Sequence, residues 1–382
     1  MTRDRAHDWI DTNRSNLVAD LAEYIDHETP SDDPELLQQG LAWIEGWLTA
    51  LIGAPVERQA FSTSGFGDTV VWDLPPTEGS HKSVSVLCHY DTVWDAGTLT
   101  NWPVAIDGDR LTGPGAFDMK GGLIQFAWAV AALKACGLPN PAIRLVLNGD
   151  EEVGSPSSRQ IIERAVSGGG PVLVFESAAN GAVKTARKGV GIFTIDVTGI
   201  EAHAGLDPLA GTSAIDEIAR IVLKLHSASD HALGTTLNVG TISGGSRTNV
   251  TAGHATAELD VRVTSNSEAN RIDAVLGGLT TADSRATVAI TGGWNRPVME
   301  RSAATGELFK VAYSTAAVLG FELREVSVGG ASDGNFAAAL GLPVLDGLGP
   351  VGSGAHARHE WISIDGMVER TALAAGLLVA LA

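Results

Sequence analysis

The amino-acid sequence predicts an α/β fold whose mostly parallel central sheet is interrupted by an inserted α+β domain. Three short apolar runs, "SVSVLCH", "IRLVLNGDEE" and "PVLVFESA", alternate with helical patterns in the first half of the chain. Near-continuous apolar strands that alternate with helices are typical of a parallel sheet covered on both faces. The pattern changes near residue 186 and returns to α/β character after about residue 300, which indicates an insertion.

Length and composition agree with a globular protein of two domains. The chain has 382 residues, of which 44% are hydrophobic and 19% are charged, so it can form two sizeable cores. It has no apolar stretch of about 18 residues, so we expect no membrane-spanning helix. The polar N-terminus lacks the apolar region of a signal peptide, and we therefore expect a cytoplasmic location.

Charge and cysteine content argue against several classes of protein. A formal net charge of −19 disfavours nucleic acid and anionic membranes as partners. It leaves a small anionic substrate open, because a local arginine cluster can override the global field. The two cysteines, Cys88 and Cys136, are too few for a disulfide framework or a cysteine-rich zinc module. We expect both to be small buried hydrophobic residues.

The elements follow this division along the chain. In residues 1–186, the three apolar runs predict strands, and "GGLIQFAWAVAALKACG" predicts a mostly buried helix because it is apolar on more than one face. Residues 187–298 form the predicted insertion, in which "GIFTIDVTG", "TLNVGTISGG" and "ATAELDVRVT" predict half-buried strands and two amphipathic segments predict helices. Residues 299–382, with a helix and "GLPVLDGLGP", complete the first domain.

Each of the three early strands ends in potential metal ligands, in "HYD", "DEE" and "FES" respectively. In open parallel sheets, ligands bind outside the carboxyl ends of the strands. The loops "GPGAFDMKGG" and "GSGAHARHEW" add an aspartate and two histidines. The candidate ligands are therefore His89, Asp91, Asp118, Asp150, Glu151, Glu152, Glu176, His356 and His359.

Each of these features has a simpler interpretation when it is taken singly. The acids of "DEE" could favour the N-terminus of the following helix. Glu176 could be a solvated charge and His89 a hydrogen-bonded core histidine. The glycine-rich loop could cradle a phosphate, but its spacing matches neither of the common phosphate-binding motifs. The combination at consecutive strand ends favours a metal site instead.

The donor types and their charge indicate which metal, and how many ions, would bind. Imidazole and carboxylate donors without thiolate suit zinc, with cobalt or manganese as substitutes. Asp118, Glu152 and Glu176 together carry −3, and a bridging hydroxide would balance two divalent ions. One zinc ion would leave these three carboxylates with an excess negative charge. The sequence therefore predicts two zinc ions per chain.

Several motifs together resemble a known enzyme family. "HYDTVWDAGTL", "GPGAFDMKGG", "NGDEEVGS", "EAHAG", "RTNV" and "GAHARHEW" are similar, in order and spacing, to the co-catalytic zinc metallopeptidases. That family includes aminoacylase, succinyl-diaminopimelate desuccinylase and glutamate carboxypeptidase, and the resemblance covers nearly the whole chain. It implies a zinc-dependent hydrolase that cleaves a peptide or N-acyl amide bond, with the inserted domain as lid and homodimer contact.

The resemblance also implies the ligands of each metal ion. His89 would bind one zinc ion and His356 the other, with Asp118 bridging them. Glu152 and Glu176 would each complete one ligand set. Relatives often have asparagine at the position of His359, and "HARHEW" places that histidine at the non-ligand position.

Further roles follow from the same resemblance. Glu151 would be the general base, close to the catalytic water but not a ligand, and Asp91 would orient His89. His203 in "GIEAHAG" matches a histidine that reaches across the dimer interface to the oxyanion. Asn249 in "RTNV" matches a polar residue of the inserted domain that faces the active site.

The sequence says less about the residues that would bind the substrate. The glutamate carboxypeptidase branch is the nearest, and in that branch basic residues hold the carboxylate of the leaving amino acid. Arg262 and Arg296 occupy matching places, with surface salt bridges as the alternative, and Lys188 is a weaker candidate. Three tryptophans near the motifs, Trp94, Trp102 and Trp294, could line an acyl pocket, although core packing is the simpler interpretation.

Three functions remain open on this basis. The leading one is a carboxypeptidase that releases a C-terminal amino acid, with glutamate or a similar residue preferred. The second is a general N-acyl-amino-acid amidohydrolase or dipeptidase that uses the same residues with another pocket. The third is a non-catalytic binding or scaffold relative, which the presence of Glu151 and every implied ligand disfavours.

Overall fold

The computed structural model describes residues 2–382, and side chains from residue 5 onward, and it confirms the predicted α/β class. The chain divides into two compact units. The first unit comprises Met1–Ala186, Arg301–Val328 and Ser332–Ala382. The second comprises Arg187–Glu300 with the short piece Gly329–Ala331, so it extends slightly past the predicted end at residue 298.

A six-stranded sheet forms the centre of the first unit, in the order β1-β2-β6-β3-β7-β14. Its strands are β1 (Glu57–Phe61), β2 (Thr69–Leu74), β3 (Ser83–His89), β6 (Ala142–Asn148), β7 (Val172–Val174) and β14 (Val344–Leu345). Strands β6, β3, β7 and β14 are parallel to one another, whereas β1 and β2 form an antiparallel edge. The three predicted strands therefore lie side by side in the parallel part, with their carboxyl ends at one edge.

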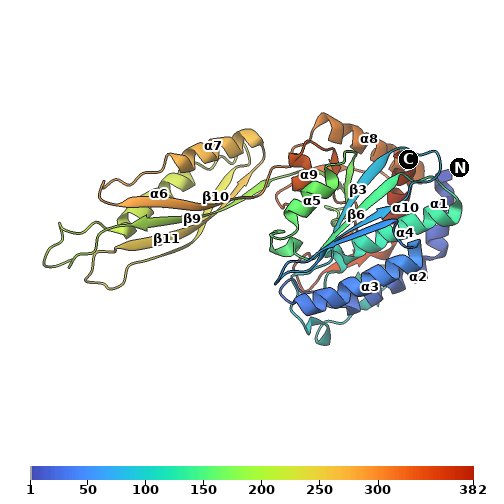
Figure 1. Ribbon diagram of the computed structural model, residues 1–382, viewed down its shortest axis with the longest axis horizontal. Helices are drawn as coiled ribbons and strands as arrows, with labels where there is room; N and C mark the ends of the chain where they lie inside the picture. Colours follow the sequence, from blue (N-terminus) through green and yellow to red (C-terminus); the bar gives the residue numbers. More distant parts are fainter. Residues whose placement is uncertain (1) are drawn as a thin grey trace. The chain divides into compact units, whose positions relative to one another are not determined.

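Helices cover both faces of this sheet (Figure 1), with α4 and α10 on one face and α5 and α9 on the other. The helices of the first unit are α1 (Thr2–Thr12), α2 (Arg14–Asp26), α3 (Pro34–Ile52), α4 (Gly121–Cys136), α5 (Arg159–Val166), α8 (Ala303–Leu319), α9 (Gly334–Ala339) and α10 (Ile364–Ala380). In the part of the chain that the structure describes, no helix is long and apolar enough to cross a membrane.

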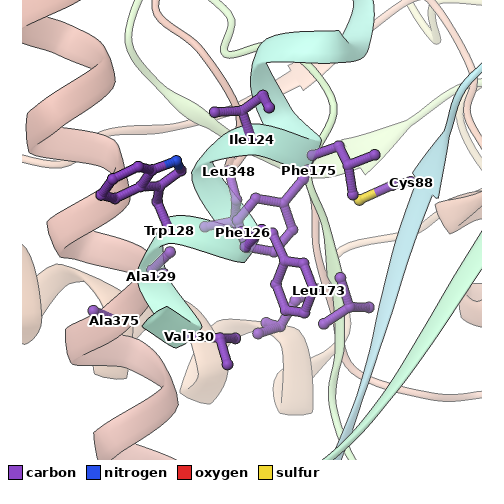
Figure 2. Close-up of a cluster of buried hydrophobic side chains, with 14 of the residues drawn as sticks. Cys88, Ile124, Phe126, Trp128, Ala129, Val130, Leu173, Phe175, Leu348 and Ala375 are labelled. Atoms are coloured by element: carbon purple, nitrogen blue, oxygen red, sulfur yellow. The ribbon is translucent and has the colours of Figure 1, made fainter. Parts of the chain in front are cut away.

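Helix α4 is the predicted buried helix, and every residue from Gly121 to Leu133 is buried. Figure 2 shows its side chains in the core, where Phe126 meets the ring of Phe175 edge-on with ring centroids 5.5 Å apart. Cys88 is buried as expected, whereas Cys136 at the end of α4 is only half-buried. Because α4 is packed on all sides, its N-terminus is fixed beside the sheet edge, and this fixes the end of the loop that precedes it.

The second unit has an antiparallel sheet in the order β10-β11-β9-β12, with two helices. Its elements are β9 (Gly189–Thr198), α6 (Ala214–Ser227), β10 (Thr236–Gly244), β11 (His254–Val263), α7 (Asn266–Gly277) and β12 (Thr287–Arg296). Strand β12 was not predicted from the sequence, because its glycine pair at 292–293 interrupts the alternating pattern. The N-termini of both helices are capped by serine side chains, Ser213 and Ser265.

Two smaller sheets complete the first unit. One pairs β8 (Val183–Arg187) with β13 (Glu325–Val328). The other has the order β15-β16-β5-β4, from β15 (Gly352–Ser353), β16 (Trp361–Ser363), β5 (Arg110–Thr112) and β4 (Ala105–Asp107). The hairpin of β15 and β16 holds the loop that carries His356.

Candidate metal centre

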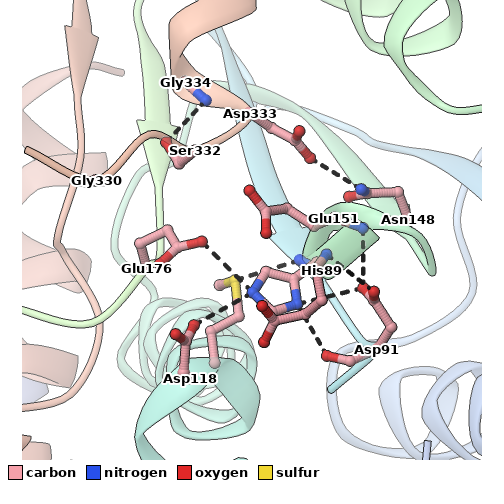
Figure 3. Close-up of polar contacts among 12 residues, drawn as sticks. His89, Asp91, Asp118, Asn148, Glu151, Glu176, Gly330, Ser332, Asp333 and Gly334 are labelled. Atoms are coloured by element: carbon pink, nitrogen blue, oxygen red, sulfur yellow. Dashed lines mark hydrogen bonds and ion pairs between the residues drawn. The ribbon is translucent and has the colours of Figure 1, made fainter. Parts of the chain in front are cut away.

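His89 lies at the carboxyl end of the central strand β3 and is 2% exposed. Its Nε2 lies 3.4 Å from Oδ1 of Asp118 and 3.4 Å from Oε1 of Glu176. Its Nδ1 lies 3.0 Å from the backbone oxygen of Asp91 and 3.4 Å from the carboxylate of that residue. The strand therefore aims one ring nitrogen at two carboxylates, while the other nitrogen is held by the segment that follows (Figure 3).

Asp118 directs its two carboxylate oxygens to two different histidines. Oδ1 faces His89, whereas Oδ2 lies 3.4 Å from Nε2 of His356. The same Nε2 lies 3.1 Å from Oε2 of Glu152. The structure thus brings all five predicted ligands into two adjoining sets, one with His89 and Glu176 and the other with His356 and Glu152, which share Asp118.

These distances fit a metal centre better than they fit hydrogen bonds. Three of the four exceed the usual length of an N–H···O bond, which is about 2.7–3.2 Å. Donors about 2.0–2.2 Å from a tetrahedral ion lie about 3.3–3.6 Å from one another. The imidazole and carboxylate donors also match the chemistry of zinc. The residues present therefore fit two divalent ions.

Glu151 and Glu152 form a single helical turn, Glu151–Val153, directly after β6. The carboxylate of Asp91 accepts the backbone N–H of Glu151 at 3.2 Å and that of Glu152 at 3.1 Å, and the hydroxyl of Ser31 donates to it at 2.8 Å. Ligand atoms of His89, Glu151 and Glu176 lie within 4.8 Å of one another. Glu151 is thus close enough to His89 and Glu176 to share a metal ion with them or to act beside one, and its role as the base stays a prediction.

The third acid of "DEE" has a different function. Oδ2 of Asp150 accepts the backbone N–H groups of Ser157 and Ser158 at 2.7 and 3.1 Å, at the start of α5. The structure therefore favours the simpler interpretation for Asp150, in which its carboxylate stabilises the N-terminus of the following helix. Ser155, in the same loop, has a left-handed φ of 54° and donates to Asp333, which also accepts from Asn148 (Figure 3).

Glycines let the main chain pass close to the site. A Cβ at Gly122 would lie 1.9 Å from the backbone oxygen of Phe175, and one at Gly349 would lie 2.2 Å from the same atom. Phe175, the residue before Glu176, therefore lies so close to the main chain at Gly122 and at Gly349 that no residue with a Cβ fits at either position. This packing accounts for part of the glycine-rich loop that had suggested a phosphate cradle.

Burial and neighbouring charges shift the pKa values of these groups. Hydrogen bonds to Asp118 and then Glu152 raise the pKa of His356 to about 10. Burial raises the pKa of Glu152 to about 7, although His356 opposes it. Burial also works against ionised Asp118, but the two imidazoles hold its pKa well below the usual range. In the metal-free protein, protons on the imidazoles thus offset the carboxylates.

Glu360, which was not predicted from the sequence as a site residue, is completely buried. Its carboxylate accepts the backbone N–H groups of Gly115, Phe117 and Asp118 at 3.0, 2.7 and 3.0 Å. Trp94 Nε1 donates to it at 3.1 Å. Its place four residues after His356 was the available signal, because an acid beside a ligand motif often supports a ligand.

The second unit presents His203 and Asn249 together. The two segments form a β-bridge between His203 and Val250, and the N–H of Ala204 donates to the backbone oxygen of Asn249 at 2.9 Å. The exposed ring of His203 accepts the N–H groups of Gly205 and Leu206 at Nδ1, each at 3.1 Å. A neutral ring that accepts twice at Nδ1 carries its proton on Nε2, which makes that nitrogen a donor.

The two predicted substrate arginines differ in their surroundings. Arg262 on β11 is paired with Asp260 on the same strand at 2.9 Å, which favours the salt-bridge alternative. Arg296 ends β12 and is 3% exposed. Lys188 donates to the backbone oxygen of Gly234, which gives it a structural contact.

The tryptophans also have structural partners. Trp94 packs edge-on against Trp102 with centroids 4.9 Å apart, besides its bond to Glu360. Trp294 donates to Asp273 at 2.9 Å and meets Phe193 edge-on. The packing interpretation accounts for all of these contacts.

Together, the fold and the donor set indicate a class of proteins, the metal-dependent hydrolases. The chain belongs to peptidase family M20/M25/M40, whose family model matches residues 86–380. The predicted family resemblance is therefore confirmed.

Relatives by sequence carry several activities in their names. Carboxypeptidase G2 of Pseudomonas sp. (strain RS-16) is 29% identical over 378 residues, which cover 95% of this chain and 88% of the relative. Acetylornithine deacetylase of Myxococcus xanthus is 32% identical over 259 residues, 62% of this chain and 64% of the relative. The cysteinylglycine-S-conjugate dipeptidase of Corynebacterium striatum is 29% identical over 149 residues, 37% of this chain and 32% of the relative.

Solved structures show the same fold. Aminopeptidase PepT from Bacillus cereus superposes with a TM-score of 0.81 at 21% identity, over 97% of this chain and 99% of that one. A metallo-carboxypeptidase from Sulfolobus solfataricus superposes with a TM-score of 0.71 at 18% identity, over 95% and 98%. The protein is thus a hydrolase of a peptidase family in fold and sequence.

Proposed function

We propose that the protein is a two-metal hydrolase that cleaves a peptide or N-acyl amide bond and releases the C-terminal amino acid, preferentially glutamate or a similar residue. The observation that carries this proposal is the placement of Asp118 between His89 and His356, each with its own glutamate. Two adjoining ligand sets that share one carboxylate are the arrangement that two-metal hydrolysis requires.

The proposed cofactor is zinc, two ions per chain, with cobalt or manganese as substitutes. When bound, the ions would polarise the scissile carbonyl and make a water molecule more acidic than bulk water. A cavity of about 10 Å³ beside His89, Glu151 and Glu176 is about the size of one water molecule. This space supports a reacting water at that place.

Glu151 is the proposed general base. Its carboxylate would take a proton from the attacking water and deliver it to the nitrogen of the leaving amino acid, so that the C–N bond breaks with a neutral amine leaving. Asp91 keeps Glu151 in place through the backbone N–H of that residue. Glu152 is assigned to the metal instead, because its carboxylate oxygen is the one that lies 3.1 Å from His356.

His203 is the proposed oxyanion donor. Its Nε2–H would donate to the carbonyl oxygen as negative charge develops there, and the two backbone bonds to Nδ1 support that tautomer. We propose that it acts in the partner subunit of a homodimer that forms through the inserted domain, with Asn249 beside it.

Arg296 and Arg262 are the proposed partners of the leaving residue's carboxylate; in the structure Arg262 is paired with Asp260. The name of the carboxypeptidase G2 relative supports a free carboxylate on the substrate. A second candidate is a dipeptidase or a general N-acyl-amino-acid amidohydrolase, which the names of the dipeptidase and deacetylase relatives favour.

A leaving-residue panel tests this proposal. The zinc-loaded protein would be assayed on substrates that share one aromatic acyl group and differ only in the leaving residue: glutamate, aspartate, alanine, leucine or arginine. We expect preferential release of glutamate. Broad or apolar preference would favour the second candidate, and a protein that binds no metal and releases nothing would contradict both.

Substitution of Arg296 tests the carboxylate pocket. Arg296→Ala should raise KM far more for substrates with a free carboxylate than for their amides, because only the former lose an ion pair. Equal effects on both substrates would remove Arg296 from the pocket.

A further inference from the structure

We propose that Glu360 is a positioning residue that ties the loop of His356 to the loop of Asp118 and so forms one of the two ligand sets. The inference rests on the proposed metal centre and concerns the set of His356, Asp118 and Glu152, called here the His356 set. The set of His89, Asp118 and Glu176 is called the His89 set.

The hydrogen bonds of Glu360 converge on the Asp118 loop. Oε1 accepts the backbone N–H of Phe117 at 2.7 Å and that of Asp118 itself at 3.0 Å. Oε2 accepts the N–H of Gly115 at 3.0 Å and Nε1 of Trp94 at 3.1 Å. Each carboxylate oxygen of Glu360 thus accepts two hydrogen bonds. Three of the four donors belong to the segment that carries Asp118, the proposed bridging ligand.

The burial of this carboxylate makes the arrangement specific. Glu360 has no exposed surface. Four N–H donors satisfy its carboxylate, and the buried Lys120 interacts with it electrostatically. A buried carboxylate without such donors is strongly destabilising. The Asp118 loop and Glu360 therefore fix each other, since neither is satisfied without the other.

The loop that carries His356 is held by backbone hydrogen bonds that include Glu360. The N–H of Ala357 donates to the backbone oxygen of Gly354 at 2.9 Å, and the N–H of Glu360 donates to that of Ala357 at 2.8 Å. His356 itself has a left-handed φ of 60°, which is uncommon for a residue with a side chain. A four-residue link of this kind transmits the position of Glu360 to the imidazole of His356.

The two ligand sets depend on Glu360 to different degrees. Asp118, which both sets share, is held by Glu360. The other two ligands of the His89 set come from the main sheet, because His89 ends strand β3 and Glu176 follows strand β7. His356 lies in the loop between β15 and β16, not on the main sheet, and its side chain is 53% exposed. Loss of the Glu360 contacts should therefore weaken the metal of the His356 set far more than that of the His89 set.

The variant Glu360→Gln tests this difference. Glutamine has the same shape, but its NH₂ group donates and cannot accept, so two of the four N–H groups lose their partner. Metal-free protein would be titrated with zinc by calorimetry, and with cobalt while its visible absorption is followed. We expect the natural protein to bind two ions tightly, and the variant to bind one ion tightly and the second about 10- to 100-fold more weakly.

Glu217→Gln is the matched control. Glu217 in the second unit is 3% exposed and accepts the backbone N–H groups of Ala282 and Asp283 at 2.6 and 3.2 Å. It also pairs with Arg220 at 2.7 Å, so it is a buried, fully hydrogen-bonded carboxylate that lies far from the ligands in sequence. Its substitution should lower the melting temperature and leave both zinc affinities unchanged.

The possible results distinguish a failure of this inference from a failure of the proposed metal centre. Two ions of unchanged affinity in Glu360→Gln, with only a lower melting temperature, would show a purely structural role and overturn the inference alone. Equal weakening of both ions would also overturn it, because the selectivity would be absent. A natural protein that binds no zinc would overturn the metal centre and the inference together.

Discussion

Asp91 accepts the backbone N–H of Glu151 at 3.2 Å, although the two residues belong to different strand ends. The same carboxylate accepts the N–H of Glu152 at 3.1 Å and lies 3.4 Å from Nδ1 of His89. The backbone oxygen of Asp91 is closer to that nitrogen, at 3.0 Å. The role expected for Asp91, orientation of His89, stays a prediction, and its side chain also anchors the turn of the two glutamates.

Replacing Asp91 should consequently disturb the metal and the base together. Asp91→Asn leaves one oxygen acceptor where two backbone N–H groups now bond, so we expect about a 10- to 100-fold loss of zinc affinity and a lower kcat at saturating zinc. Zinc titration and steady-state kinetics measure both quantities. Asp73→Asn, which removes a half-exposed ion pair with Arg144 elsewhere on the sheet, should change neither. Unchanged zinc affinity in Asp91→Asn would contradict the anchoring role.

Glu151 and Glu152 should differ sharply when each is changed to glutamine. Glu151→Gln should keep both metal ions and lose turnover by about 10³-fold or more, because only proton transfer is removed. Glu152→Gln should lose affinity for one ion, since its carboxylate faces His356. Metal content and kcat of the two variants, measured side by side, check this. Metal loss in Glu151→Gln would mean that base and ligand have been exchanged.

Mixed dimers can show whether His203 acts in the partner subunit. His203→Ala and Glu151→Gln should each be nearly inactive alone. If His203 works across the interface, a mixed dimer has one site with Glu151 and His203 both intact, so random mixing should restore about a quarter of the natural activity. Refolding or co-expression of the two variants, followed by an activity assay, measures this. No recovery in dimers shown to be mixed would place His203 in its own subunit's site.

Metal binding should release protons and weaken in acid. Hydrogen bonds to Asp118 and Glu152 raise the pKa of His356 to about 10, so at neutral pH this imidazole is protonated in the metal-free protein. A metal ion requires it neutral, and zinc affinity should fall by up to about tenfold per pH unit for each proton released. Calorimetry at pH 7 in buffers of different ionisation enthalpy counts those protons. Binding without proton release would contradict the charge balance described for the metal-free site.

Gly122 should not tolerate even a methyl group. In Gly122→Ala the new Cβ would meet the backbone oxygen of Phe175 at 1.9 Å, so the backbone must move, at a cost of about 1–3 kcal/mol in the free energy of unfolding. Gly46→Ala is the matched control, because Gly46 lies inside α3 with open space around it. That change should be neutral or stabilise by about 0.5–1 kcal/mol. Denaturant unfolding of both metal-free variants compares them, and equal stability would contradict the close packing.

The sequence predicted the elements whose periodicity is strong. The buried runs that became β3, β6 and β7 and the all-apolar helix α4 were recognisable, because burial on every side leaves no polar residues. Strand β12 was not, because Gly292 and Gly293 weaken its alternation and four of its ten residues are exposed. Its sheet neighbour β9 had no such interruption and was found.

The proposed ligand residues were also accessible from sequence, because they lie at strand ends or in glycine-rich loops with a recognisable motif. The residues that position them were not. Glu360 and Asp333 act through hydrogen bonds to segments far away in the chain, and no local pattern reveals which backbone a buried carboxylate will meet. The pairing of Arg262 with Asp260 was an open alternative for the same reason, although the two residues lie on one strand.

The wide separation of the two histidines along the chain affects how the protein matures. His89 emerges early in synthesis, whereas His356 and Glu360 come from the last segment, next to the helix that completes the core on α4. A chain that has not yet been extended to residue 356 can therefore present at most the first proposed ligand set. A chain truncated before β15 would lack the proposed second set and also helix α10, which packs in the core of the first unit.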